Sequence, residues 1–374
     1  MPKNIVLCCD GTSNQFSEDR TNVIKLYSVL QQSASQVTFY HPGIGTMEPS
    51  GALTSFSRAF FKIIELAVGW GLEYDIRDAY IFLMRTYEPG DKVYMFGFSR
   101  GAYTVRAVAA LLHAYGLIRQ GNETLVPYAI RMMMAIQRAN NLPPGKRNEE
   151  EFEKYSKLSR EFKATMCRTD CKPWFVGVWD TVSSVGWLEN SLKLPYVTNN
   201  PDIQFGRHAV AIDERRAFFR NHLWRKPAPP AAGGPVDVKQ VWFVGTHSDV
   251  GGGHPEKESG LAKLALEWMI AEAKLQGLQV DDAKVDMVLG RTNTDFAKPN
   301  CDAELHESLA GFWKIAEFIP KKHFEFATGK TSWRANRFRR RAIPPQSFVH
   351  ESAFSRKDNY KNCLPPDAIP VKTP

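Results

Sequence analysis

The pattern of apolar and polar positions predicts strands that alternate with helices. Short apolar runs, each closed by a polar or glycine-containing segment, are typical of the buried strands of a parallel sheet. Apolar residues at three-to-four spacing predict amphipathic helices between these runs. The predicted strands are 4–9, 37–40, 92–96, 174–179 and 239–244, and the predicted helices are 23–32, 55–70, 75–87, 102–115 and 261–276.

This alternation predicts a fold of the α/β-hydrolase type, with a mostly parallel central sheet, helices on both faces and a helical insertion at about 120–172. We assign residues 1–300 to this catalytic domain. The periodicity weakens beyond residue 300. Residues 301–374 are therefore predicted to form a C-terminal extension that packs on the domain or trails from it.

Four of the predicted strands lead to a reactive side chain. These side chains are Asp10, Ser99, Asp180 and His247. Ligands of such sheets bind at the carboxyl ends of the strands. We therefore expect the four side chains to converge in one crevice.

A candidate nucleophile lies in residues 97–101, which read Gly-Phe-Ser-Arg-Gly and match the pattern G-x-S-x-G. A predicted strand precedes the motif and a predicted helix follows it, which is the context of a nucleophile elbow. The two glycines suit a turn that is too tight for side chains beside the serine. A plain glycine-rich turn is the alternative, and the context favours Ser99 as a nucleophile.

A nucleophilic serine needs a base, and the base needs an orienting acid. His247 and Asp180 each follow a predicted strand, and the chain order Ser99, Asp180, His247 is that of the α/β-hydrolases. Helix capping is the alternative role for the aspartate and the histidine. Asp249 is a candidate supporting residue. Asp213, in a predicted helical stretch, is more typical of an ion pair with an arginine.

An oxyanion hole needs two preorganised N–H donors. The amide of Arg100, directly after the predicted nucleophile, is one candidate, and the loop after the first strand offers another at Gly11 or Thr12. Asp10 is a candidate supporting residue in that loop. The run 10–12 also resembles part of the haloacid-dehalogenase phosphatase motif D-x-D-G-T. However, Cys8 stands where that motif has its nucleophilic aspartate.

No metal or organic cofactor is predicted. His247, Asp249 and His254 could mimic a metal cluster, but their spacing and context favour a base at His247. The six cysteines are too few for a disulfide framework in a chain of 374 residues. Cys167 and Cys171 have no second pair that would complete a zinc site.

The formal net charge of +8 favours anionic partners. Two features favour a lipid surface: the apolar helix 55–70, and a cluster of five arginines beside Trp333 and Phe338. Their alternatives are a core helix and a solvated or ion-paired face. No nucleic-acid motif accompanies the charge, so the predicted partner is a lipid or small ester, with peripheral membrane contact. The arginines are Arg334, Arg337, Arg339, Arg340 and Arg341.

The sequence shows neither a secretion signal nor a run of about 18 apolar residues that would span a membrane. We therefore expect a cytoplasmic location, with export by a dedicated secretion system as the alternative. The sequence specifies no oligomeric state.

Five blocks occur in an order that is far more specific than G-x-S-x-G alone. They are 9–14 (Cys-Asp-Gly-Thr-Ser-Asn), 43–46 (Gly-Ile-Gly-Thr), 96–103 (Phe-Gly-Phe-Ser-Arg-Gly-Ala-Tyr), 178–182 (Val-Trp-Asp-Thr-Val) and 245–253 (Gly-Thr-His-Ser-Asp-Val-Gly-Gly-Gly). Together, over about residues 3–275, they resemble the catalytic domain of the type VI secretion phospholipase effectors, long catalogued as a domain of unknown function. The resemblance implies an α/β-hydrolase fold, phospholipase A activity and a triad at Ser99, Asp180 and His247.

We therefore predict a serine hydrolase that cleaves acyl esters, in particular those of a lipid or phospholipid, through an acyl-Ser99 intermediate. A soluble carboxylesterase and a non-catalytic binding protein on a hydrolase fold are the two alternatives.

Overall fold

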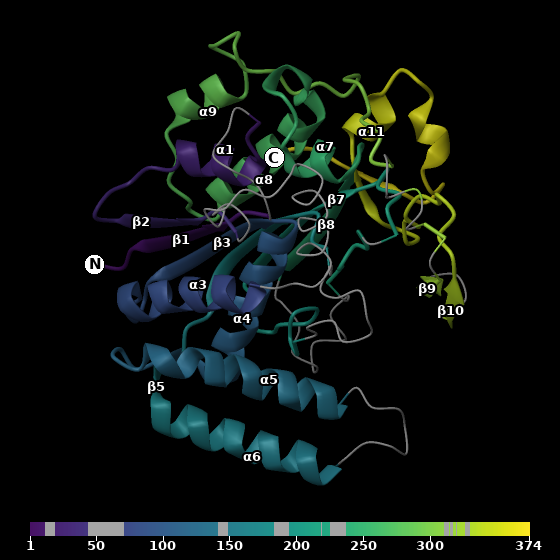
Figure 1. The fold of residues 1–374 in the computed structure, drawn as a ribbon. Helices are drawn as coiled ribbons and strands as arrows, with labels where there is room; N and C mark the ends of the chain where they lie inside the picture. Colours follow the sequence, from purple (N-terminus) through teal and green to yellow (C-terminus); the bar gives the residue numbers. More distant parts are fainter. Residues whose placement is uncertain are drawn as a thin grey trace, which may run out of the picture.

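An eight-stranded sheet organises the computed structural model of the chain (Figure 1). The structure describes residues 1–11, 19–43, 71–140, 149–182, 194–217, 219–224, 237–309, 314, 317–318, 320–325 and 330–374. The strand order is β12-β11-β8-β7-β6-β3-β1-β2, and every pair of neighbours is parallel. The predicted α/β class with a mostly parallel central sheet is thus confirmed.

Three strands of this sheet were absent from the sequence prediction. β7 is a central strand of the sheet but carries the buried polar residues Arg207 and His208, which interrupt its apolar run. Asp213 follows this strand and does not lie in a helix, so its predicted helical context was wrong. The strands are β1 (Asn4–Cys9), β2 (Gln36–His41), β3 (Lys92–Phe98), β6 (Pro173–Trp179), β7 (Phe205–Ala211), β8 (Asp237–Phe243), β11 (Phe348–His350) and β12 (Ile369–Val371).

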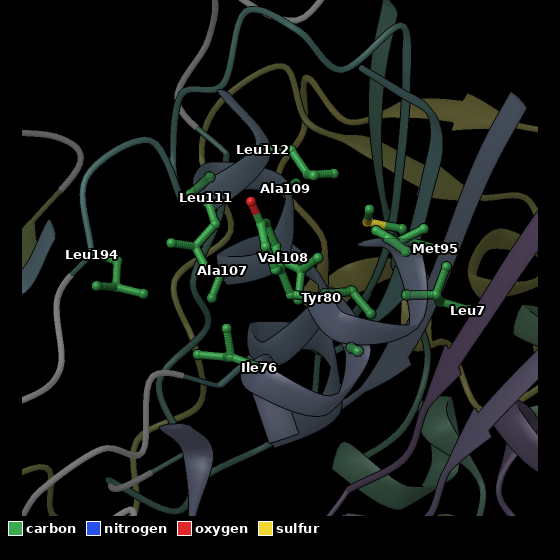
Figure 2. Packing of buried hydrophobic residues seen from close by; sticks show 14 of the residues in the cluster. Leu7, Ile76, Tyr80, Met95, Ala107, Val108, Ala109, Leu111, Leu112 and Leu194 are labelled. Carbon is green, nitrogen blue, oxygen red and sulfur yellow. The ribbon is translucent and has the colours of Figure 1, made fainter. Parts of the chain in front are cut away.

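Helices cover both faces of the sheet (Figure 1). Side chains alternate across a strand, so the two faces of β1 enter different cores. Leu7 packs with α3 and α4, as Figure 2 shows, whereas Val6 packs with α1 and α8. The helices of the first face are α3 (Leu72–Thr86), α4 (Arg100–Tyr115), α5 (Val126–Asn140) and α6 (Glu149–Met166), and those of the second are α1 (Asn22–Val29), α7 (His247–Gly251), α8 (Gly260–Leu275) and α9 (Asp282–Val288).

The predicted helical insertion is the pair α5 and α6, which forms the outermost layer beneath α4 (Figure 1). A short antiparallel pair, β4 (Leu117–Ile118) and β5 (Cys167–Thr169), closes the base of this insertion. The predicted helix at 55–70 lies outside the described residues.

The residues beyond 300 add two strands to the edge of the central sheet, because β11 pairs with β8 and β12 pairs with β11. They also form a separate antiparallel ribbon, β9 (Lys321–Glu325) and β10 (Lys330–Arg334), and the short helix α11 (Ser352–Ser355). Three single-turn helices, η1 (Glu123–Leu125), η3 (Glu256–Glu258) and η4 (Tyr360–Cys363), complete the described elements. The division of the chain at residue 300 stays a prediction.

Helix α4 begins in close contact with the end of β1. A Cβ atom on Gly101 would lie 2.1 Å from the carbonyl oxygen of Cys9, and one on Gly97 would lie 2.4 Å from the carbonyl oxygen of Gly101. Both obstacles are backbone atoms, which cannot rotate away as a side chain can. Glycine at these two positions therefore lets the helix start directly beneath the turn at Ser99.

Among the described helices, none has the length and apolar character needed to cross a membrane.

We predict that Gly101→Ala lowers the free energy of unfolding by about 3 kcal/mol, because the added methyl group forces β1 and α4 apart. Urea unfolding followed by tryptophan fluorescence measures this loss. Gly206→Ala is the matched control: the nearest atom to its Cβ is the rotatable Cγ2 of Val238 at 3.0 Å. Equal losses in the two variants would contradict the proposed backbone clash.

Candidate active site

The predicted reactive residues lie at one edge of the sheet. Their strands are aligned, with Cys9 opposite Gly97 on β3, Phe98 opposite Trp179 on β6 and Trp179 opposite Ala209 on β7. Each chain segment leaves its strand at this edge, so Asp10, Ser99 and Asp180 follow three neighbouring strands. His247 begins α7 after β8, two strands further along the sheet.

Three of these side chains form a continuous hydrogen-bonded chain. His247 Nε2 lies 2.8 Å from Ser99 Oγ, and His247 Nδ1 lies 2.5 Å from Asp180 Oδ2. The three residues are buried, with 9%, 4% and 0% exposure for the serine, histidine and aspartate. Ionised Asp180 accepts only, so Nδ1 carries the proton and Nε2 is left to accept from the serine hydroxyl.

Ser99 lies in the turn between β3 and α4. Its backbone has φ 57° and ψ −119°, a conformation that L-residues rarely adopt. The Ser99 N–H donates to the carbonyl oxygen of Trp179, and α4 starts at the next residue. Such strain is typical of a functional turn that the surrounding packing holds in place.

His247 sits in an apolar and aromatic environment. Its ring centroid lies 4.6 Å from that of Phe98 and 4.9 Å from that of Phe219. Burial lowers the pKa of His247, and the hydrogen bond and charge of Asp180 oppose this effect. The backbone N–H of His247 donates to Glu214 Oε2 at 3.2 Å, and this contact fixes the start of α7. The lowered pKa favours the neutral imidazole, and the contacts with Asp180 and Ser99 orient the ring at its two nitrogens.

Asp180 is the most constrained of these groups. Its Oδ1 accepts from the Ala211 N–H at 3.0 Å and from Arg341 Nη1 at 2.5 Å, and its Oδ2 accepts from Arg341 Nη2 at 3.1 Å. Burial alone would raise the pKa of Asp180, but the charge of Arg341, followed by the hydrogen bond and charge of His247, holds it well below its usual range. From the sequence, Arg341 was predicted only as part of a basic cluster, because no local pattern links it to Asp180.

Of the three predicted oxyanion residues, Arg100 and Gly11 lie within the described residues and Thr12 does not. Arg100 is the first residue of α4, and its buried guanidinium has Nε 3.7 Å from Asp75 Oδ2. The Gly11 N–H donates to Asp10 Oδ1 at 2.7 Å, so this amide already has an acceptor. The other oxygen, Asp10 Oδ2, accepts from Thr21 Oγ1 at 2.5 Å. Thr12 lies outside the described residues.

Asp249 takes part in a second set of contacts beside the site. Its Oδ2 accepts from the Thr246 N–H at 2.9 Å and caps α7, and its Oδ1 lies 2.5 Å from His306 Nδ1. The His306 ring stacks on His254 with centroids 3.7 Å apart. Asp249 and His254 therefore cluster with His306, and not with His247 as their spacing in the sequence suggested.

This second cluster is the group of described residues that could hold a metal ion, with ligand atoms of Asp249, His254 and His306 within 4.8 Å of one another. The direct hydrogen bond from His306 to Asp249 and the nearly parallel rings, at 14°, are the geometry of a hydrogen-bonded stacked pair. Metal binding would instead require a ring nitrogen of each histidine to point at the ion.

Asp213 has structural partners, and the Cys8 thiol is buried. Asp213 Oδ2 accepts from the Gly245 N–H at 2.9 Å, and Asp213 Oδ1 lies 3.4 Å from Arg340 Nη1, as the sequence analysis expected of an arginine ion pair. Cys8 lies within β1, where burial raises the pKa of its thiol. An inert thiol therefore occupies the position that the phosphatase alternative would require to be an aspartate.

One family model matches most of the chain. Residues 3–272 match the model of the family described as "T6SS, Phospholipase effector Tle1-like, catalytic domain". The chain is 34% identical over 226 residues to an uncharacterized protein of Saccharomyces cerevisiae, YEL023C, and the match covers 58% of this chain and 32% of that protein. The chain thus spans about a third of the length of this curated relative.

Two solved structures are also similar. One is an uncharacterized protein from Pseudomonas aeruginosa, with a TM-score of 0.45, 19% identity and coverage of 79% of this chain and 49% of that one. The other is the Tle1 effector bound to the VgrG spike from the type 6 secretion system, with a TM-score of 0.33, 18% identity and coverage of 70% and 52%.

The His306–Asp249 contact predicts a pH-dependent stability. Burial opposes protonation of His306, but the hydrogen bonds and charges of Asp249 and then Glu258 together raise its pKa. A raised folded-state pKa stabilises the protein below the ordinary value of 6.5 and ceases to do so as the pH rises through the folded-state pKa. The Tm difference between the wild type and His306→Gln should therefore be larger at about pH 5.5 than at about pH 9.

His350→Gln is the control for this measurement. Burial lowers the pKa of His350 to about 4, so its effect on stability has the opposite sign and appears as a loss when the pH falls below about 6.5. A Tm difference for His306→Gln that grows with pH would contradict the assigned contact.

Proposed function

The chain belongs to the family of Tle1-like phospholipase effector catalytic domains, and we propose that it is a serine hydrolase that cleaves acyl esters of a lipid or phospholipid. The observation that carries the proposal is the hydrogen-bonded chain from Ser99 through His247 to Asp180, with distances of 2.8 Å and 2.5 Å. Serine, imidazole and carboxylate in this order form the set of groups that acyl transfer through a serine requires.

The proposed reaction has two halves. Ser99 Oγ attacks the ester carbonyl carbon while His247 Nε2 takes the hydroxyl proton, and His247 then returns that proton to the departing alcohol. Water next attacks the acyl-Ser99 carbonyl with the same histidine as base, which releases the fatty acid and restores the serine. Asp180 stays ionised, holds the imidazole tautomer and stabilises the imidazolium in each half.

We assign one oxyanion donor to the Arg100 amide at the N-terminus of α4, where the helix dipole favours negative charge. The second donor is assigned to the loop after β1, at Gly11 or Thr12. The Gly11 N–H bonds Asp10 at 2.7 Å, so it would have to exchange that carboxylate for the oxyanion. Asp10, which accepts a hydrogen bond from Thr21, supports this loop and takes no part in the proposed proton transfers.

A lipid substrate is supported by the family and by exposed aromatic and basic residues near the C-terminal ribbon. Trp333 and Phe318 are each 59% exposed and Phe338 is 38% exposed, and Arg337 and Arg339 are exposed beside it in sequence. Aromatic and basic side chains of this kind favour the surface of an anionic bilayer. We propose peripheral membrane contact through them. The cytoplasmic location and export by a secretion system stay predictions.

Four of the five arginines of the predicted cluster divide into two groups. Arg340 and Arg341 contact Asp213 and Asp180, so they belong to the ion-paired alternative and not to the membrane surface. Arg337 and Arg339 remain available for the membrane surface. No described observation favours the non-catalytic alternative, and the soluble carboxylesterase is distinguished by experiment.

We predict that Ser99→Ala lowers kcat on a p-nitrophenyl ester by about 10⁴-fold or more, because the acyl-enzyme cannot form. The wild type should react with a fluorophosphonate probe, and the variant should not. Ser35→Ala, which removes an exposed hydroxyl, is the matched control and should behave as the wild type. Activity of Ser99→Ala within tenfold of the wild type would refute the assignment of the nucleophile.

The substrate class predicts a dependence on the lipid surface. Hydrolysis of a phospholipid in vesicles that contain anionic lipid should exceed that of the same molecule dispersed below its aggregation concentration, and it should fall with added salt because basic contacts are screened. Rates on a short soluble ester are measured beside it. A protein that cleaves the short ester and gains nothing at the vesicle surface would be a soluble carboxylesterase.

A further inference from the structure

We propose that Arg341 is a positioning residue of the active site, which holds the carboxylate of Asp180 in place and balances its charge. The proposal rests on the proposed function and adds a fourth group to it. Arg341 lies beyond residue 272, where the match to the family model ends, and 161 positions from Asp180 in the chain. It therefore makes the C-terminal segment a part of the site.

The guanidinium of Arg341 is fixed on two sides. One side bonds both oxygens of Asp180, through Nη1 at 2.5 Å and Nη2 at 3.1 Å. The other side donates to backbone carbonyls, from Nη1 to Ala211 at 3.1 Å and from Nη2 to Phe219. The side chain is only 8% exposed. A planar group held in this way can orient a carboxylate bidentately, which a lysine ammonium cannot do.

Arg341 stabilises the buried negative charge of Asp180. The carboxylate is fully buried, and besides Arg341 it accepts only from the Ala211 N–H and from His247 in the described contacts. An ionised group in such a place is stable only when it is paired and hydrogen-bonded. Without the cation, the carboxylate would depend on His247 for its counter-charge and would lose the bidentate contact that fixes its plane, so the imidazole would be held less precisely and protonated more readily.

The same cation also changes the base. An arginine that shares the charge of Asp180 leaves less of it to stabilise the imidazolium, so His247 should remain neutral to a lower pH. The other charged groups that face His247 are Glu214 and Arg216. Glu214 accepts from the backbone N–H of His247, and Arg216 is ion-paired to Glu214 at 2.9 Å. Burial alone would raise the pKa of Glu214, but the hydrogen bond and charge of Arg216, followed by the charge of Arg341, hold it low. The contact with Arg216 remains when Arg341 is replaced. The acid side of the pH–rate profile therefore reports the charge at position 341.

A purely structural role for Arg341 makes different predictions. Arg341 also ties the segment around residue 340 to β7, so its loss will lower stability in either case. A loss of stability alone would reduce the amount of folded enzyme and would leave the midpoint of the pH–rate profile where it was. A shift of that midpoint, together with rescue by a conservative variant, separates positioning from mere anchoring.

The experiment compares Arg341→Met, Arg341→Lys and the control Arg160→Met, which removes an equal charge from an exposed position on α6. The kcat and KM for a short soluble ester are measured from about pH 5 to 9. We expect Arg341→Met to lose about a hundredfold in kcat with KM nearly unchanged, and its acid midpoint to move up by about one pH unit. Arg341→Lys should keep the wild-type midpoint and lose only about tenfold in kcat, because it restores charge without the bidentate contact.

Several results would overturn the inference. One is a folded Arg341→Met protein whose acid midpoint equals that of the wild type, and another is an Arg341→Lys variant as impaired as Arg341→Met. If Arg341→Met does not fold, the lysine variant decides: wild-type kcat in that variant would overturn bidentate positioning. Failure of the proposed function looks different, since a wild type that neither hydrolyses esters nor labels with fluorophosphonate removes the reaction itself.

Discussion

A buried negative charge is the constraint on which the site depends. Asp180 has no exposed surface, yet its carboxylate must remain ionised to orient the imidazole of His247. Water cannot supply the hydrogen bonds, so the protein does, through the N–H of Ala211 at the end of β7 and the guanidinium of Arg341. The site can therefore form only when three distant parts of the chain are docked together.

The sheet brings the first groups together by its register. Parallel strands place their carboxyl ends at one edge, and the alternating side chains of β1 enter two cores that fix the helices above and below. These relations follow from local patterns of apolar residues and from the glycines of the turn. For this reason the sequence sufficed to predict the parallel sheet, the turn at Ser99 and the strand ends that carry Asp180 and the segment of His247.

Other parts could not be predicted, because their polar residues are buried by partners far away in the chain. In β7, Arg207 pairs with Glu272 of α8 at 2.5 Å, and this pair hides a central strand from any search for apolar runs. His306 and Arg341 bond aspartates that lie 57 and 161 positions away. A residue's own neighbours in sequence show nothing of such contacts, so Arg341 was assigned only to a basic cluster.

The contacts of the C-terminal segment share one kind of target. Arg341 bonds Asp180, His306 bonds Asp249 and Ser308 donates to Glu214 at 3.1 Å. Each of these carboxylates stands in a segment that follows β6, β7 or β8, beside or within the proposed site. The segment thus supplies donors to the acidic groups at the carboxyl edge of the sheet. Docking of the segment and correct charge at the site are then one cooperative event, because removal of the donors would leave buried carboxylates without partners.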